Sequence, residues 1–144
     1  MPTWVTAGWD DYARRMPRNF ALRLVPLKPE SRDRGKTVAS MLAAEATRIA
    51  AACRDALVVA LDERGQRWTT RDLADRLARW RDDSRNVAFV IGSADGLAEG
   101  LKRKAQAVVA LSAMTLPHGL VRVLLAEQLY RAACLLTGHP YHRE

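Results

Sequence analysis

Apolar residues along the chain fall into two kinds of pattern, short continuous runs and longer segments with helical spacing. Continuous runs of this length are typical of strands buried on both faces of a parallel sheet. They predict strands over Ala56–Leu61, Val87–Ile91 and Ala107–Leu111. Apolar residues at helical spacing predict helices over Trp4–Arg15, Thr37–Cys53, Arg71–Arg81, a short segment ending near Lys104, and about Leu120–Leu136. Strands that alternate with helices predict an α/β fold with a mainly parallel sheet.

Three local features complete this prediction. The segment Phe20–Leu27 alternates loosely between apolar and polar residues, which predicts a further strand. Either Thr69 or Thr70 is placed to cap the helix that follows it. Because the chain has no internal repeat and no low-complexity linker, we expect residues 1–144 to form a single domain.

Composition limits the class of protein and its partners. With 144 residues, 49% of them hydrophobic and 27% charged, the chain can bury one sizeable core, which excludes a disordered or fibrous protein. The formal net charge is +7 and the pI is near 10.1. Such a surplus favours a polyanionic partner, such as RNA or DNA, or an anionic membrane surface, without deciding between them.

Targeting and metal signals are weak. The start Met-Pro-Thr-Trp does not resemble a secretory signal, and the weakly polar stretch Ala105–Pro117 is too short to span a bilayer. Cys53 and Cys134 are isolated cysteines without a CxxC motif or a histidine at ligand spacing. We therefore expect a cytoplasmic protein with reduced thiols, no metal site and no membrane partner.

The carboxyl ends of the predicted strands are the natural place for a ligand, because ligands of parallel α/β sheets bind there. Gly92 begins the sequence GSADG after one strand, although a glycine in this position is most often part of an ordinary turn. The segment Ser112–His118 is a mostly apolar loop between a strand and a long helix. It is expected to line a pocket or to pack in the core, and the residues alone do not separate the two.

Several segments together make the chain recognisable. The sequence LSAMTLPHGLVRVLLAEQLYRA and the terminal HPYHRE closely resemble the RlmH family of SPOUT-class RNA methyltransferases. The segments PTWVTAGWDDYARRMP, LDERGQRW and FVIGSADGL follow the order and spacing of that family, so the resemblance covers essentially the whole chain. Residues 111–144 are its most specific part.

The resemblance implies an S-adenosyl-L-methionine-dependent enzyme that methylates N3 of a pseudouridine in a stem-loop of 23S ribosomal RNA on the ribosome. It also implies an obligate homodimer, a SPOUT-type parallel sheet with helices on both faces, a trefoil knot over about residues 88–136, and an active-site tail at 139–144. Two alternatives remain at this point. One is a SPOUT enzyme that acts on another RNA, and the other is a catalytically silent ribosome-binding module.

Site residues follow from the resemblance by position. The expected contacts to the methyl donor are Leu61, Gly92, Leu111, Ser112, Ala113, Met114, Thr115 and Leu116. The reaction must remove a proton from an imide nitrogen and stabilise the resulting anion. His142 is the first candidate for the proton acceptor and His118 the second, while Arg143 or Arg131 suits the charge stabilisation. Tyr141 is expected to stack on the target base.

The chain departs from the family pattern in two places. The family usually has IGGPEG where this chain has Ser93, Ala94 and Asp95 after Ile91-Gly92. If the second glycine position needs a positive φ, Ser93 would be strained by roughly 1 kcal/mol. The family also carries one further strand before the position of Met1, so we expect the first strand of the sheet to be missing.

Basic residues divide into two groups. Those of the helix over Arg71–Arg81 have acids at i,i+4 spacing, as in Arg71–Asp75 and Asp75–Arg79, which predicts a self-paired solvated face. Arg14, Arg15 and Arg18 are followed by no nearby acid after Asp11. The better candidates for phosphate contacts are these three together with Lys28, Arg32, Arg34, Lys36 and Lys102–Lys104. The last helix has an i,i+4 pair, Glu127 and Arg131, and more apolar residues than one core-facing stripe needs, which predicts burial in a dimer.

Overall fold

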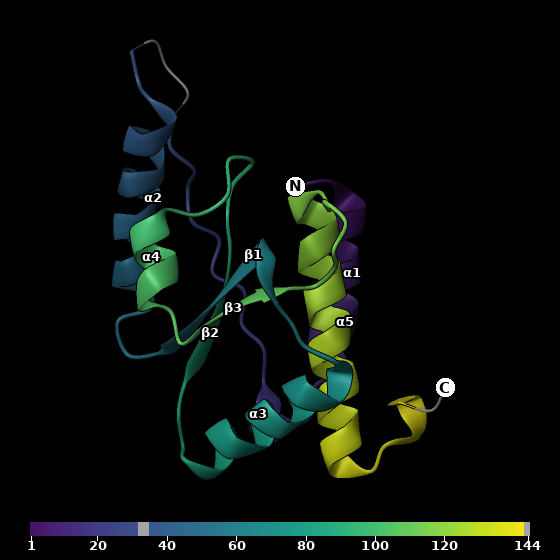
Figure 1. Cartoon of the computed structure of the whole chain (residues 1–144). Coiled ribbons are helices and arrows are strands. Elements are labelled where there is room, and N and C mark those ends of the chain that lie inside the picture. Colours follow the sequence, from purple (N-terminus) through teal and green to yellow (C-terminus); the bar gives the residue numbers. More distant parts are fainter. Residues whose placement is uncertain (32–34, 143–144) are drawn as a thin grey trace.

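The computed structural model describes residues 1–31 and 35–142 as an α/β arrangement of five α-helices, two short 3₁₀ helices and three strands (Figure 1). In chain order the elements are α1 (Thr3–Arg15), η1 (Arg18–Phe20), α2 (Val38–Ala52), β1 (Leu57–Arg67), α3 (Thr70–Asp82), β2 (Val87–Ile91), α4 (Glu99–Lys104), β3 (Ala107–Ala110), α5 (His118–Thr137) and η2 (Pro140–His142).

The three strands form one parallel sheet in the order β2-β1-β3, which confirms the predicted fold class. Leu61 of the central strand pairs with Ile91 on one side and with Val109 on the other. The carboxyl ends of all three strands therefore lie at the same edge of the sheet. This edge is the one at which the sequence places the candidate ligand contacts.

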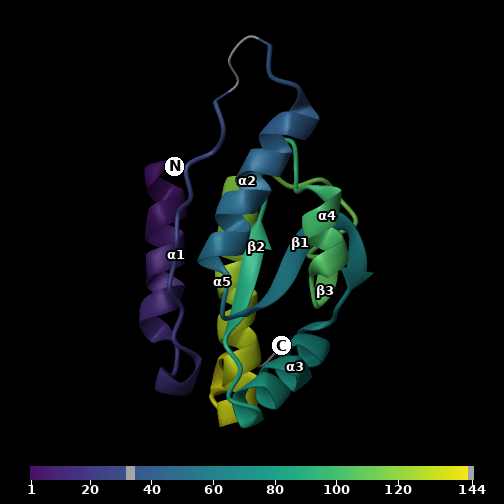
Figure 2. The ribbon, with the colours of Figure 1, turned by 90° about the vertical axis from the view of Figure 1, so that its left-hand side faces the viewer.

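Helices cover both faces of the sheet, as Figure 2 shows. On one face, Ala60 and Val90 pack with Ile49 of α2 and with Leu97, beside α4. On the other face, the side chains of the strands lie under α3 and α5; they include Val59, Leu61, Phe89, Ile91 and Val109. The alternation of side chains along each strand explains why the apolar runs are continuous, because both faces are buried. Helix α1 packs on α5.

Local side-chain chemistry sets the ends of two helices. Thr69 accepts a hydrogen bond from the backbone N–H of Asp72 at 3.0 Å, and the Asp72 carboxylate accepts one from the Thr69 N–H at 2.9 Å. This capping box settles the helix start in favour of Thr69 over Thr70. Helix α5 ends at Thr137 and is capped by Gly138, whose φ of 78° is a left-handed conformation that glycine adopts without strain.

The strand predicted over Phe20–Leu27 is wrong. Arg18–Phe20 form η1, and residues 21–31 run on without regular structure. Leu24, Val25 and Leu27 are 38%, 50% and 40% exposed. Loose alternation favours an extended backbone, but a strand also needs a neighbour to pair with. None of the described strands lies in register with this segment.

Strand β1 is longer than predicted, since it continues from Leu57 to Arg67. Its pairing with β3 shifts between Leu61 and Gln66, so the residues between them bulge out of the ladder. At Gly65 a side-chain Cβ would stand 2.6 Å from the backbone of Val108 and Val109. The glycine therefore allows the second half of β1 to reach β3, a contact that the polar sequence after Leu61 does not reveal.

Candidate functional site

The parallel register brings three of the predicted donor contacts to one edge of the sheet. Leu61 is paired with Ile91, the residue before Gly92, and with Val109, two residues before Leu111. Sequence spacing alone does not place Leu61, Gly92 and Leu111 together, because 31 and 19 positions separate them along the chain. The register does so.

A cavity of about 170 Å³ lies beside this edge, between the sheet, α3 and α5. Its walls are mostly apolar and include Leu61 and Leu111, while Thr69 and Gln128 add polar groups. Gln128 is held in place because its side-chain oxygen accepts a hydrogen bond from the Thr70 hydroxyl at 2.7 Å. Gly92 and residues 112–116 lie outside the lining of this cavity.

The loop over residues 111–116 is anchored by side chains and largely exposed. Ser112 Oγ accepts a hydrogen bond from the Met114 N–H at 2.9 Å, and Thr115 Oγ1 donates one to Glu63 Oε2 at 2.6 Å. Ala113, Met114 and Thr115 are exposed rather than buried, Met114 at 75%. Within the described residues, the backbone groups of Ala113, Thr115 and Leu116 make no backbone hydrogen bond, so they are available to a ligand.

The turn after β2 explains why a glycine occupies position 92. A Cβ on Gly92 would stand 2.5 Å from the carbonyl oxygen of Gly96, with which Ser93 forms an isolated bridge. Ser93 is not strained, since the one non-glycine residue with positive φ in the described part of the chain is Ser84. Instead, the Ser93 hydroxyl donates to Glu45 Oε1 at 3.0 Å and ties the turn to α2.

An ion pair that sequence reasoning missed fixes the backbone directly after Leu61. Lys102 Nζ lies 2.9 Å from Asp62 Oδ2 and 2.9 Å from Glu99 Oε1, and the Arg64 N–H donates to Asp62 Oδ1 at 2.8 Å. Burial raises the pKa of Asp62, but the hydrogen bonds from Lys102 and Arg64 outweigh it and leave this pKa below its ordinary value. Hydrogen bonds to Asp62 and Glu99 raise the pKa of Lys102. Lys102 is therefore engaged inside the protein, contrary to its expected role at a phosphate.

Tyr141 sits in a cluster of aromatic and charged side chains at the other end of α5. Its hydroxyl donates to Glu127 Oε2 at 2.9 Å and lies 3.3 Å from the Tyr12 hydroxyl. Its ring packs edge-on against Tyr130, with centroids 4.6 Å apart, and Arg15 and Arg131 lie over it at 5.5 and 5.0 Å. Burial, followed by the hydrogen bonds with Tyr12 and Glu127, raises the pKa of Tyr141.

Arg131 and Glu127 form the ion pair predicted from their spacing, with N and O 2.8 Å apart. The charge of Arg131 is thus partly neutralised by its own helix. The other predicted cation, Arg143, lies outside the described residues, as does the side chain of His142. His139 Nδ1 accepts a hydrogen bond from the Tyr141 N–H at 3.2 Å.

Among the described candidates, His118 and Tyr141 do not lie together in one copy of the chain. His118 is the first residue of α5 and is exposed, next to the 111–116 loop. Tyr141 packs on Tyr130, which lies about 18 Å further along the same helix. Figure 1 shows the same separation, with the loop at one end of α5 and the carboxyl-terminal segment at the other.

The self-paired face expected on α3 does not form. Within residues 1–31 and 35–142, no ion pair joins Arg71 to Asp75, or Asp75 to Arg79. Asp72 is occupied by the helix cap, and Arg76 lies over the Trp68 ring at 4.4 Å from its centroid. Arg71 and Arg79 therefore have no acidic partner within the described residues, whereas Arg81 of the same helix pairs with Asp82 at 3.2 Å.

The described residues contain no group of three or more His, Cys, Asp or Glu side chains placed to hold a metal ion. Cys53 and Cys134 are both free thiols. No helix in the described part of the chain has the length and apolar character needed to cross a bilayer.

Comparison with known proteins gives consistent matches over nearly the whole chain. Residues 1–142 match the family model for predicted SPOUT methyltransferases. The chain is 54% identical, over 147 aligned residues, to the ribosomal RNA large subunit methyltransferase H of Nitrosospira multiformis. It is 55% identical, over 144 residues, to the proteins of the same name in Burkholderia mallei and Burkholderia pseudomallei. Each of these alignments covers 99% of this chain and 92% of the relative.

Proposed function

Because the chain belongs to the SPOUT methyltransferase family, we propose that it methylates N3 of a pseudouridine in a stem-loop of 23S ribosomal RNA on the ribosome. Members of this family use S-adenosyl-L-methionine as methyl donor. The observation that supports this function most directly is the register of the sheet. It sets the ends of β1, β2 and β3, with their three loops, side by side at one edge.

The residues at this edge fit the methyl donor. The adenine and methionine parts would contact Leu61, Gly92 and the loop over Leu111–Leu116. The apolar cavity beside Leu61 and Leu111 offers contact surface, and the free backbone groups of Ala113, Thr115 and Leu116 offer hydrogen bonds. When bound, the donor supplies a methyl group activated by a sulfonium charge.

Protein side chains must then orient the base and take up a proton. His142 and His118 are the candidates for the proton acceptor, and Arg143 is the better candidate for stabilising the anion, because Arg131 is already paired with Glu127. Tyr141 has its hydroxyl and one ring edge engaged within its own chain. We therefore assign it the positioning of the tail over residues 139–144 in place of the expected stacking on the base.

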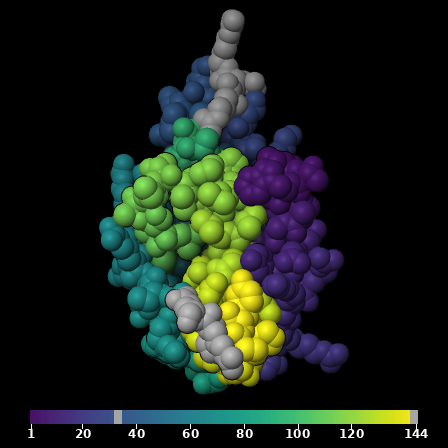
Figure 3. Space-filling view, turned by 90° about the vertical axis from the view of Figure 1, so that its right-hand side faces the viewer, coloured from purple at the N-terminus to yellow at the C-terminus, as the bar shows by residue number. Residues whose placement is uncertain are grey.

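We further propose that the enzyme is a homodimer in which the tail of one copy completes the site of the other. The distance of about 18 Å along α5 between His118 and Tyr130, on which Tyr141 packs, supports this arrangement. In one copy the described part of the tail lies far from the donor loops, by which we mean Gly92 with the turn after it and residues 111–116. Figure 3 shows that α5 lies at the surface on this face of the molecule, beside α1. Exposed apolar side chains near its start, Trp4 at 54% and Met114 at 75%, would be covered by a partner.

The same proposal includes a knotted chain path and a cytoplasmic location. The chain leaves β3 at one edge of the sheet and enters α5, which contacts β2 at the other edge. This crossing supports a trefoil knot over about residues 88–136 within a single domain. A ribosomal substrate places the enzyme in the cytoplasm.

Methyl incorporation from labelled S-adenosyl-L-methionine tests the function. We expect transfer to intact ribosomes or large subunits and none to transfer RNA. Transfer to transfer RNA instead would indicate a SPOUT enzyme with another substrate. Failure to bind the donor in calorimetry would indicate a silent ribosome-binding module.

Thr115→Val tests the donor site with a side chain of nearly the same size as threonine. The variant removes the hydrogen bond to Glu63 that anchors the 111–116 loop, so donor affinity should fall several-fold while the melting temperature stays nearly constant. Thr47→Val is the matched control, because its hydroxyl bonds only to its own helix at Ala43. A Gly92→Val variant is less informative, since the new side chain would displace the backbone of Gly96 even without a ligand. Unchanged affinity in Thr115→Val would place the donor elsewhere.

Deletion of residues 139–144 tests the tail. Methyl transfer should be abolished, while light scattering still shows a dimer and the donor still binds, because the donor loops lie at the other end of α5. Full activity after the deletion would exclude a catalytic role for the tail and leave His118 as the remaining histidine candidate.

A further inference from the structure

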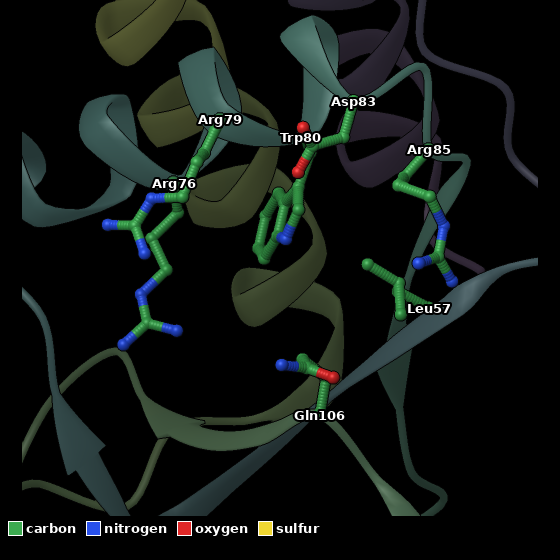
Figure 4. A pocket seen from close by; sticks show the side chains of 7 residues that line it. All are labelled: Leu57, Arg76, Arg79, Trp80, Asp83, Arg85 and Gln106. Carbon is green, nitrogen blue, oxygen red and sulfur yellow. The ribbon is translucent and has the colours of Figure 1, made fainter.

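A second cavity, of about 200 Å³, lies at the edge of the sheet opposite the donor loops (Figure 4). It is lined by Leu57, Arg76, Arg79, Trp80, Asp83, Arg85 and Gln106. Leu57 begins β1, and Arg85 and Gln106 precede β2 and β3, so the cavity sits at the amino ends of the strands. It is about 13 Å from Leu61 along β1.

Hydrogen-bond donors dominate the walls of this cavity. Arg76, Arg79 and Arg85 keep their positive charge at any physiological pH, and Gln106 adds a side-chain amide. Asp83 supplies the single acidic group of the lining. Within the described residues, neither Arg79 nor Arg85 has a carboxylate within 4.0 Å. The cavity therefore carries an uncompensated positive charge.

Trp80 adds a buried donor without an acceptor. Its side chain is 8% exposed and lies between the rings of Trp68 and Phe89, with centroids 6.5 and 6.3 Å away. Figure 4 shows its indole nitrogen directed into the open space above Gln106. Within the described residues, this N–H makes no hydrogen bond, whereas the indole N–H of the neighbouring Trp68 donates to Gln66 Oε1 at 3.3 Å. A buried donor left unpaired is unfavourable, and a ligand oxygen would remove that cost.

The end of α3 at this cavity repels an anion less than an uncapped helix end would. The last carbonyl groups of the helix would repel negative charge if they were free. However, the carbonyl oxygens of Arg79, Trp80 and Arg81 accept hydrogen bonds from the N–H groups of Asp83, Arg85 and Ser84, at 2.9 to 3.0 Å. Ser84, with φ of 54°, turns the chain back so that these bonds form.

We propose that this cavity binds a phosphodiester group of the RNA substrate, as a contact separate from the methylation site. The identity of the polyanion rests on the proposed function, whereas the anion chemistry rests on the cavity itself. Arg79 and Arg85 are exposed at the rim, so a nucleic-acid strand that continues past the cavity can reach both. Arg76 lies over the Trp68 ring, 4.4 Å from its centroid, and this contact restricts the position of its guanidinium group.

The indole signals of the full chain, labelled with ¹⁵N, test the site directly. The sequence has four tryptophans, and the signal lost in Trp80→Phe identifies Trp80. We expect this signal to shift on addition of a stem-loop oligoribonucleotide and, at higher concentration, in inorganic phosphate at constant ionic strength. A shift in phosphate but not in RNA would show a site for free anions and overturn the proposal, as would no shift in either.

Affinity measurements with matched variants give a second, independent test. Arg79→Gln should raise the Kd for the oligoribonucleotide about tenfold and reduce the salt dependence by about 0.7 in log–log slope. Arg71→Gln makes the same charge change on the same helix outside the cavity, and should alter the Kd less than twofold. Equal effects of the two variants would overturn the proposal.

The outcomes also separate this inference from the proposed function. If ribosomes are not methylated but the Trp80 signal still responds to RNA, the function fails and the contact stands. If ribosomes are methylated and Arg79→Gln binds RNA as the unmodified chain does, the contact alone fails. Calorimetry with S-adenosyl-L-methionine on both variants should give unchanged donor affinity, which confirms that the donor edge is intact.

Discussion

Removal of a single hydroxyl group at Tyr141 measures how firmly the carboxyl-terminal segment is held. In Tyr141→Phe the ring keeps its edge-on contact with Tyr130 and its position under Arg15 and Arg131. The variant loses the hydrogen bond to Glu127 at 2.9 Å and the neighbouring hydroxyl of Tyr12 at 3.3 Å. It therefore isolates the polar part of the contact from the aromatic part.

The size of the effect follows from the partners. A hydrogen bond to a charged group contributes about 1.5–3 kcal/mol. The low end applies here, because Glu127 retains Arg131 at 2.8 Å and is not left buried without a partner. A loss of about 1.5 kcal/mol lowers the ratio of docked to undocked tail roughly tenfold.

The rate of amide hydrogen exchange at position 141 measures the ratio of docked to undocked tail. The Tyr141 N–H donates to His139 Nδ1 in the docked segment, and exchange proceeds through the open population. We expect exchange about tenfold faster in Tyr141→Phe. Tyr12→Phe is the control, since it removes only the longer hydroxyl contact and should change exchange less than threefold. Unchanged exchange in Tyr141→Phe, or equal acceleration in both variants, would refute the assigned role of the Glu127 hydrogen bond.

Three further predictions concern the rest of the fold. Lys102→Met should lower the free energy of unfolding by about 2 kcal/mol near pH 7 in urea melts, because it removes a partner from the largely buried Asp62. The pKa of Asp62 is lowered in the folded state. The difference in unfolding free energy between the variant and the unmodified chain should therefore shrink as the pH falls through that pKa and persist above it. Gly65→Ala should lower the melting temperature by several degrees, because its Cβ would stand 2.6 Å from the backbone of β3; a melting temperature equal to that of the unmodified chain would contradict the close approach. Burial raises the pKa of the Cys53 thiol, so it should react with a disulfide reagent at pH 8 more slowly than free cysteine, and Cys134, with 0% exposure, should react only after unfolding.

Local patterns in the sequence were sufficient to predict the three buried strands and the helices between them. Each apolar run is a strand of the observed sheet, because both faces of a parallel sheet are covered and no polar position interrupts it. The cap of α3 was also accessible, since Thr69 and Asp72 have the spacing of a capping box. The ion pair between Glu127 and Arg131 likewise follows from spacing on one helix.

Features that depend on distant residues were not accessible in this way. Asp62 and Lys102 are 40 residues apart, and Tyr12 and Tyr141 are 129 apart, so only the fold brings either pair together. The predicted strand over Phe20–Leu27 failed for the same reason, because pairing depends on a neighbour and not on the segment itself. Resemblance to a family supplied the expected donor contacts, and the register of β1 brings three of these residues, Leu61, Gly92 and Leu111, to one edge.

The two edges of the sheet differ in a way that suits two different ligands. At the donor edge the charged groups are already satisfied, Asp62 by Lys102 and Glu63 by Thr115, and the adjoining cavity is mostly apolar. At the opposite edge the guanidinium groups of Arg79 and Arg85 have no acidic partner in the described residues. Affinity for a methyl donor should therefore depend weakly on salt, while affinity for RNA should depend on it strongly. Because the two cavities lie about 13 Å apart along β1 and have no lining residue in common, Arg79→Gln should leave donor affinity unchanged and Thr115→Val should leave RNA affinity unchanged.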